Sequence, residues 1–349
     1  GAINAEPEFR EPLERLVVLI ERRQSYKNLG KLLERLVRIA VGPAERARAL
    51  ADYGLFKAEH ERDLEEAKGL LDDATGEQPE DAALWLGLES VAASLADKPL
   101  RARALTARAE LTQHAAWRAL LLIDLARLLA ETGEPAAAID VLERAAAGDT
   151  IARFPALQAL ERLGRGEGRD DVVASALEAQ ADLLARSSGE PTAGDALGLP
   201  GHARTPEHVA DTLMRAAYAR RRQGALDAAT ALLDRALGLL PDEPTLIHAR
   251  SAAADALGDT ETVTALARRQ LATVTTGPVA GSSWLRVAEG AAAEQDAAAA
   301  LAAVNEALTC DAGAIPALAI RLDLLAGAGD GAALAAALES LAERLESED

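Results

Sequence analysis

The 349-residue chain has little cysteine, few aromatic residues and no long apolar run. Its one cysteine, Cys310, excludes internal disulfides and any zinc or iron–sulfur site built from several thiolates. Uncharged apolar stretches such as 297–304 are far shorter than the roughly 18 residues that a membrane-spanning helix needs. Aromatic residues make up only 3% of the chain, too few to fill the pleated surface of a sheet. We therefore expect neither a membrane span nor a β-rich fold.

Alanine and leucine dominate what is present, with 82 and 56 residues. Both lose little side-chain entropy in a helix and stand high in helix propensity. A core made mostly of these two residue types fills a thick globule poorly but suits thin layers of closely packed helices. The composition therefore predicts an all-helical protein.

Acidic residues outnumber basic ones by 56 to 37, which gives a net charge of −19. Nucleic acids and anionic membranes are bound chiefly through Lys and Arg, so the charge disfavours both as partners. The two ends differ, because residues 1–50 carry ten basic and seven acidic residues whereas 280–349 carry three and twelve. A basic stretch near the start is either a site for an acidic partner or a solvated helix face: Arg22, Arg23, Lys27, Lys31, Arg35 and Arg38.

A pattern of small and large residues recurs with a period of 34 residues. In the clearest copy, Gly224 is followed by Ala229, Leu233 and Ala236, and then by Pro241. The other copies are Ala67-Leu71-Ala74, Ala138-Leu142-Ala145 and Ala300-Val304-Ala307. Alanine at a helix crossing lets two backbones approach closely, and proline ends the second helix. The pattern predicts stacked helix-turn-helix pairs with these alanines at the contacts.

The pattern resembles the tetratricopeptide repeat family, with Leu122/Ala126, Leu213/Ala217 and Trp284/Ala288 at the family's early large and small positions. The resemblance is strongest over 119–152 and 210–243, good over 281–314, and weaker over 1–118 and 154–209. It implies an all-α fold, a right-handed α-solenoid of about nine antiparallel helix pairs. In this family the first helix of each pair lines a concave groove that holds a peptide.

Apolar periodicity and capping residues place the helix pairs and one break between them. The expected pairs are 10–40, 43–75, 80–113, 115–147, 152–186, 205–239, 243–273, 280–309 and 313–346. Expected helix starts include Thr205-Pro206 and Ser282-Ser283. The Gly/Pro-rich segment 187–204 is expected to be a linker or a functional loop, between pairs 1–5 (1–186) and pairs 6–9 (205–349).

The family resemblance also implies which side chains face the groove. On the repeat at 210 these are Asp211, Met214, Tyr218, Arg221 and Arg222; on the next repeat they are Thr245, His248, Ala252 and Asp255; and on the repeat at 119 they are Leu120, Ile123, Arg127 and Glu131. A thioether, a phenol and guanidinium groups suit a partner with acidic and apolar elements. The alternative is that Met214 and Tyr218 only fill the stack. The family's carboxylate clamp is not expected, because these positions lack its Lys and Asn residues.

Other motifs carry no recognisable chemistry. His202 and His208 flank the long loop without the spacing of a metal site, so a polar loop and a helix start explain them. The glycines of 164–168 resemble a phosphate loop only superficially, since no strand precedes them and no Lys-Ser/Thr follows. They are expected to end one helix and open the next. We expect no catalytic residues, no metal and no cofactor.

The sequence therefore predicts a non-catalytic scaffold that binds a protein or peptide partner. A regulatory or sensor module acting on a domain outside this chain is an alternative, and a nucleic-acid-binding helical repeat is a third hypothesis that the negative charge disfavours. The chain starts with Gly1 rather than Met, and its arginines outnumber lysines by 32 to five. We expect a piece of a longer bacterial protein located in the cytoplasm; the oligomeric state is left open.

Overall fold

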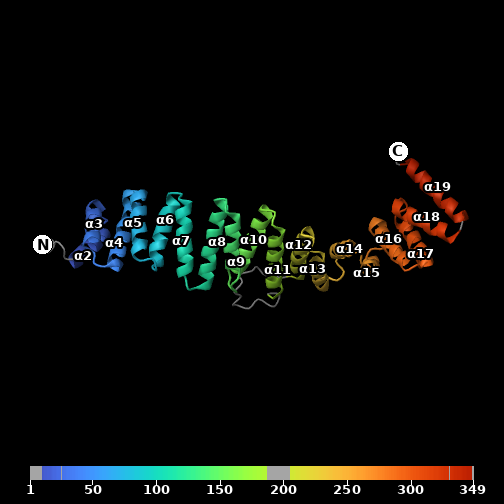
Figure 1. The fold of residues 1–349 in the computed structure, drawn as a ribbon, viewed down its shortest axis with the longest axis horizontal. Helices are drawn as coiled ribbons and strands as arrows, with labels where there is room; N and C mark the ends of the chain where they lie inside the picture. Colours follow the sequence, from blue (N-terminus) through green and yellow to red (C-terminus); the bar gives the residue numbers. More distant parts are fainter. Residues whose placement is uncertain (1–9, 25, 187–204, 330, 348–349) are drawn as a thin grey trace. The chain divides into compact units, whose positions relative to one another are not determined.

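The computed structural model describes residues 10–24, 26–186, 205–329 and 331–347, which form successive helices joined by short turns (Figure 1). These ranges contain eighteen α-helices and no strand. They also contain a 3-10 turn at Tyr26–Asn28 and a π-helical turn at Lys57–Glu61, which directly follows α4. Within the described part of the chain, no helix is both long and apolar enough to span a membrane.

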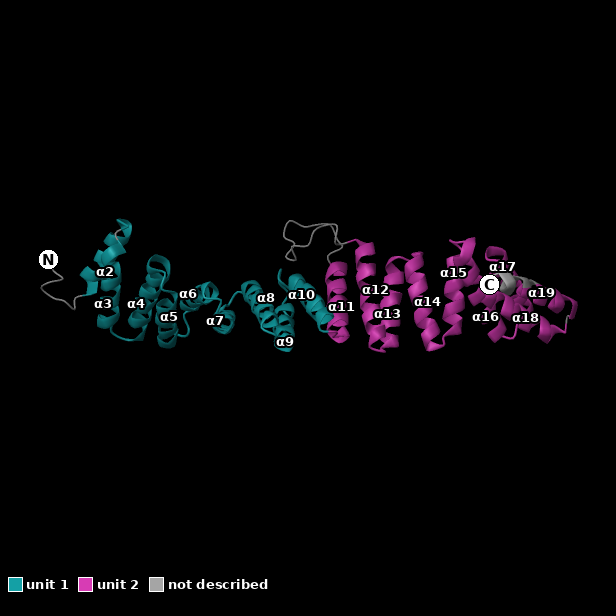
Figure 2. Cartoon of the chain, turned by 90° about the horizontal axis from the view of Figure 1, so that it is seen from above, with its two compact units in different colours: residues 1–167, 195–198 teal, residues 168–194, 199–349 magenta. Residues whose placement is uncertain are grey.

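The chain divides into two compact units between Glu167 and Gly168 (Figure 2). Unit 1 contains α2 (Arg10–Arg22), α3 (Leu29–Ile39), α4 (Pro43–Phe56), α5 (Leu64–Glu77), α6 (Ala82–Ser94), α7 (Lys98–Leu111), α8 (Ala115–Glu131), α9 (Pro135–Ala146) and α10 (Arg153–Gly166). Unit 2 contains α11 (Asp170–Arg186), α12 (Pro206–Arg222), α13 (Leu226–Leu239), α14 (Pro244–Leu257), α15 (Thr260–Leu271), α16 (Gly277–Ala293), α17 (Ala297–Cys310), α18 (Ile315–Ala328) and α19 (Gly331–Ser347).

The nine expected helix pairs correspond to these helices, with even numbers as first helices and odd numbers as second helices. Within each unit, every helix packs against the next along the chain. The expected all-α helical-repeat fold is thereby confirmed. The expected linker 187–204 lies outside the described residues and stays a prediction. The boundary between the two compact units falls in the turn between α10 and α11, and α11 packs against α12.

The recurring alanines lie where the repeat predicts, at the helix contacts. Each is at most 1% exposed: Ala67, Ala74, Ala138, Ala145, Ala229, Ala236, Ala300 and Ala307. The large residue between each two is also buried: Leu71, Leu142, Leu233 and Val304. Among the described glycines, the least space is at Gly290 of α16, where an added Cβ would lie 2.1 Å from Thr264 Oγ1 of α15. Part of the alanine content is therefore specific packing rather than helix propensity alone.

The turns between paired helices repeat one backbone conformation. Gly133, Gly224, Gly258 and Gly329 all have φ between 72° and 83°, the left-handed region that glycine tolerates best. Gln295 stands at the corresponding turn of the eighth pair with φ of 64°, as the 34-residue period predicts. Gly168 likewise has φ of 67° between α10 and α11. Gly166 ends α10 and Gly168 forms the turn, as expected, whereas Gly164 lies buried within α10.

Helix starts follow the usual capping chemistry, with one correction. Thr205 caps α12 by accepting a hydrogen bond from the His208 amide, as expected. The expected start at Ser282-Ser283 is wrong, because α16 begins at Gly277 with Pro at its second position. Ser283 instead lies buried within α16 and donates to the Val279 carbonyl. The apolar residues before it extend the helix by another turn and a half.

Candidate partner-binding surface on the first helices

On α12, the predicted groove residues lie on one helix face. Asp211, Met214, Tyr218 and Arg221 are spaced by three and four residues, which places them on one stripe of an α-helix. Tyr218 is 42% exposed, whereas Met214 is half-buried. An exposed tyrosine on an otherwise well-packed helix is available to a partner, while Met214 also contributes to the packing of the stack.

The arginine run at the end of α12 has two different tasks. Arg222 donates to both carboxylate oxygens of Asp170 on α11, with N–O distances of 2.5 to 3.0 Å, and this lowers the pKa of Asp170. Arg220 donates to Glu178 on the same helix at 2.7 Å. Arg221 makes no ion pair with any other described residue. Arg220 and Arg222 therefore bind α11, and Arg221 keeps its charge available.

Of the predicted residues on α14, Thr245, His248 and Asp255 are polar and exposed, whereas Ala252 is apolar and half-buried. Thr245 donates to Glu243 at 2.9 Å, and His248 is exposed one turn further along. Asp255 accepts from Arg286 of α16, the first helix of the next pair, at 3.2 and 3.4 Å. This ion pair brings side chains of successive first helices together on one face of unit 2.

In unit 1, a cavity of about 550 Å³ lies between α6, α7 and α8. Its lining includes Leu120 and Ile123, both implied by the family resemblance to face the groove. Trp117, in the first turn of α8, is 63% exposed at the same cavity, and Leu120 is 38% exposed. Arg127 lies one turn beyond, exposed and paired with Asp124 at 3.1 Å. An exposed tryptophan beside an open apolar cavity is typical of a protein-docking site.

The floor of this α8 cavity is charged. Glu89 of α6 accepts a hydrogen bond from Arg108 of α7, and both side chains are largely buried. Arg101 Nε of α7 lies 3.8 Å from the other oxygen of Glu89, too far for a hydrogen bond, and has no hydrogen-bond partner among the described atoms. Two guanidinium groups thus share one carboxylate.

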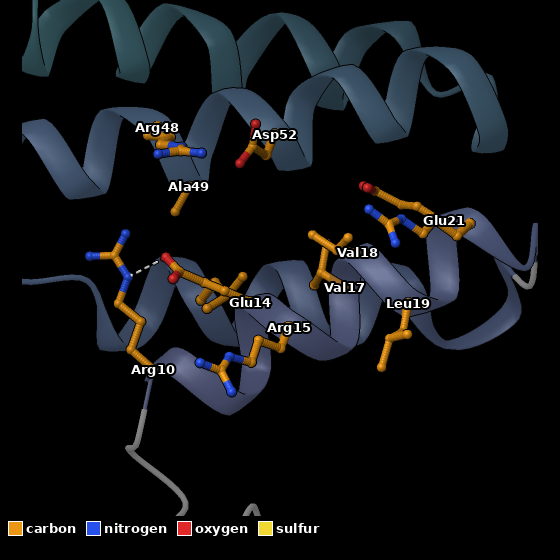
Figure 3. A pocket seen from close by; sticks show the side chains of 12 residues that line it. Arg10, Glu14, Arg15, Val17, Val18, Leu19, Glu21, Arg48, Ala49 and Asp52 are labelled. Atoms are coloured by element: carbon orange, nitrogen blue, oxygen red, sulfur yellow. Dashed lines mark hydrogen bonds and ion pairs between the residues drawn. The ribbon is translucent and has the colours of Figure 1, made fainter.

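A second cavity, of about 690 Å³, lies between α2, α3 and α4 (Figure 3). Val17 and Val18 of α2 point toward α4, from which Arg48 and Asp52 point back. Glu14 and Arg10 form an ion pair at one end of the cavity. Loss of water around its carboxyl raises the pKa of Asp52, although nearby Arg48 opposes the rise.

The two cavities occupy the same place in the repeat. Each lies between a first helix, the second helix of the same pair and the first helix of the next pair. Buried Ala47 and Leu50 correspond to Ala119 and Leu122, so Arg48 takes the position of Leu120. Two of the spaces between successive first helices of unit 1 therefore hold a cavity at the same repeat position.

Sequence reasoning did not find Trp117 or the α2 cavity. Trp117 precedes the stretch 119–152 over which the family pattern matches, and the α2 cavity lies where the resemblance is weak. One signal was available, since Trp117 is one of only three tryptophans and stands in the first turn of an expected helix. The basic stretch near the start contributes Arg22 to the lining of the α2 cavity, while Arg38 pairs with Glu34.

The most strongly perturbed lysine is ill suited to catalysis. Lys57 lies 2.8 Å from both Glu61 and Glu66, and these hydrogen bonds raise its pKa well above the ordinary value. A lysine that acts as a base or nucleophile needs a lowered pKa. Lys57 therefore stays protonated and joins the π-helical turn to α5.

No protein-family model and no curated protein matches this sequence. The solved structures that resemble it include proteins titled as TPR repeat proteins. MamA from Desulfovibrio magneticus RS-1 is 13% identical over 58% of this chain and 98% of its own, with a TM-score of 0.41. Part of a TPR repeat-containing protein from Cytophaga hutchinsonii is 14% identical over 77% and 98%, with a TM-score of 0.36. YrrB, titled a TPR protein with an unusual peptide-binding site, is 18% identical over 58% and 91%, with a TM-score of 0.31.

Proposed function

We propose that this protein is a non-catalytic scaffold that binds a protein or peptide partner on the face formed by its first helices. The observation that carries the proposal is the pair of cavities at equivalent places in unit 1, one of them beside an exposed tryptophan. Solvent-exposed apolar side chains next to a cavity lose unfavourable hydration when a partner covers them.

In unit 2, the residues that we propose to contact the partner are those of the same face: Asp211, Met214, Tyr218, Arg221, Thr245, His248 and Asp255. Arg127 is the corresponding residue of unit 1, and it takes the repeat position of Tyr218. Arg222 has a lesser part, because a partner carboxylate would have to compete with Asp170 for it. The free guanidinium of Arg221 and the phenol of Tyr218 suit a partner with acidic and apolar elements.

A regulatory module that changes the activity of a domain outside these residues would use the same face. Such a module differs from a scaffold only in the effect that partner binding has on the other domain, so both functions require binding on this face. A nucleic-acid partner is disfavoured by the net charge of −19. The single cysteine suits a reducing compartment, and we keep the cytoplasm as the proposed location.

Affinity capture from cell extract, read by mass spectrometry, tests the proposal. The wild-type protein is compared with Tyr218→Ala/Arg221→Glu in unit 2 and Trp117→Ala/Leu120→Asp in unit 1. All four residues are exposed or half-buried, so the variants should keep the helical circular dichroism spectrum. A matched control carries Glu143→Ala on α9 and Ala231→Glu on α13, two exposed positions on second helices.

We expect both first-helix variants to lose a protein that the wild type and the control retain. Hot-spot truncations of this kind lower affinity by about tenfold or more. If the wild type and all variants retain the same proteins in equal amounts, the first-helix face is not the binding surface and the proposal fails.

A further inference from the structure

The α8 cavity combines an apolar wall with a charged floor. Trp117, Leu120, Leu121 and Ile123 of α8 form the apolar side of the lining. The polar part of the lining is Glu89 of α6, Arg108 and Thr112 at the end of α7, and Asp124 of α8. A side chain entering from the Trp117 side therefore meets hydrocarbon first and charged groups beneath it.

The charges of the floor do not balance. The side chains of Glu89 and Arg108 are only 14% and 21% exposed, and Arg101 contributes a second guanidinium to the same carboxylate. Arg101 Nε is buried and donates no hydrogen bond to a described atom. A partly desolvated pair of guanidinium groups with a single carboxylate is favourable for a second carboxylate, because charge-assisted hydrogen bonds are strong where water is excluded.

The surroundings strengthen the positive excess. Arg118, next to Trp117, donates twice to the carbonyl of Thr112, at 3.0 and 2.7 Å. Asp124 and Arg127 at the other end form a neutral pair. Four arginines in and around the cavity, Arg101, Arg108, Arg118 and Arg127, thus accompany only two carboxylates, Glu89 and Asp124. In a chain with a net charge of −19, this local excess favours an acidic segment.

We infer that the α8 cavity binds an acidic segment of a protein partner, with one large apolar side chain against Trp117 and Leu120 and one carboxylate on Arg108. The inference rests on the proposed function and specifies the chemistry of the partner at this one cavity. The partner carboxylate shares Arg108 with Glu89, whose charge is also balanced by Arg101 at 3.8 Å. The aromatic wall gives the affinity, and the guanidinium selects acid over amide.

Two libraries of N-acetylated, C-amidated octapeptides test this inference. Each peptide of the first library contains one Phe or Leu and one Glu, separated by up to four residues drawn from Ala, Ser, Gly and Gln. The second library is identical except that Gln replaces Glu. The blocked ends remove terminal charges, so that retention by the immobilised full chain reports on side chains alone.

We expect at least about tenfold greater retention of the Glu library, and we expect Trp117→Ala and Arg108→Gln to abolish the difference. Arg108→Lys keeps the charge but not the planar donor geometry, so part of the difference in retention between the two libraries should remain. Leu257→Ala is the matched control, since Leu257 is an exposed leucine of unit 2. Thermal unfolding verifies that Arg108→Gln is folded, and Trp117→Ala serves as the test if it is not.

Equal retention of the two libraries, no retention, or retention that Trp117→Ala leaves unchanged would overturn the inference. A change in sedimentation on Trp117→Ala without peptide retention would also overturn it and would identify a second copy of the chain as the occupant. If capture from extract still depends on the first helices, the proposed function survives such a failure. If that capture is also independent of the first helices, both the proposed function and this inference are contradicted.

Discussion

The first-helix faces of the two units are built from different side chains on the same scaffold. In unit 1, Trp117, Leu120 and Leu86 expose apolar surface, and two cavities lie between the helices. In unit 2, the corresponding face carries Tyr218 among charged residues, some already paired, such as Asp255 with Arg286. The buried alanine and leucine positions are nearly the same in both. Packing residues therefore repeat along the chain, whereas the surface residues that meet a partner vary.

The sharpest way to test the common packing is to remove the same buried leucine from each unit. Leu71→Ala and Leu233→Ala each leave a cavity at the centre of a helix pair, because both leucines are at most 1% exposed. We expect each to lower the free energy of unfolding by about 3 kcal/mol. Hydrogen exchange should report the loss mainly in the helices around the substitution. A difference between the two costs of more than about 2 kcal/mol would show that the repeats are not equivalent.

The close contact in unit 2 gives the next largest effect. Gly290→Ala forces its Cβ against Thr264 Oγ1, and we expect a loss of about 2 kcal/mol in urea unfolding. Gly238→Ala is the control, because a Cβ there meets nothing within 4 Å, and it should leave stability equal or higher. Thr264→Ala should rescue part of the Gly290→Ala loss. An unchanged stability of Gly290→Ala would contradict the packing of α15 on α16.

Capping aspartates of second helices provide a smaller and symmetric test. Asp63 starts α5 in unit 1 by accepting from the Glu66 amide, and Asp296 starts α17 in unit 2 by accepting from the Ala299 amide. We expect Asp63→Ala and Asp296→Ala to cost about 1 kcal/mol each by thermal unfolding. The conservative Asp→Asn or Asp→Ser variants should keep most of the stability. A loss of stability in only one unit would show that the two units differ in the capping of their second helices.

The smallest effect is expected from the ion pair of Arg222 with Asp170. The pKa of Asp170 is lowered in the folded protein, so its contribution to stability is present above the unfolded value of about 3.9 and is lost as pH falls through the lowered pKa. We expect Asp170→Asn to lower the Tm slightly at pH 7 and to match the wild type near pH 2. A difference that persists unchanged down to pH 2 would contradict an electrostatic origin.

The sequence predicted the fold well because the fold depends on periodic packing residues. Ala229, Leu233 and Gly224 each have one physical task, and each recurs at a fixed interval. The start of α16 was misjudged because Ser282 and Ser283 resemble capping residues, although the small residues before them continue the helix. Local capping chemistry was overridden there by the packing of Ala280 and Gly281 against the neighbouring helices.

The candidate surface was predicted only in part, because surface residues follow no period. Leu120, Ile123 and Tyr218 could be placed by their repeat position. The ion pair of Arg222 with Asp170 could not be predicted, because the two residues are 52 positions apart and meet only when α11 packs on α12. The sharing of Glu89 by Arg101 and Arg108 likewise depends on the facing of α6 and α7.

Photo-crosslinking in cells tests most directly the claim that the first helices form the partner-binding face. A photoreactive phenylalanine analogue replaces Leu120 or Tyr218 on the first helices, and Glu143 or Ala231 on the second helices. The account predicts a discrete crosslinked protein from the first two positions and none from the last two. Crosslinks of equal yield from all four positions, or from the second helices alone, would contradict it.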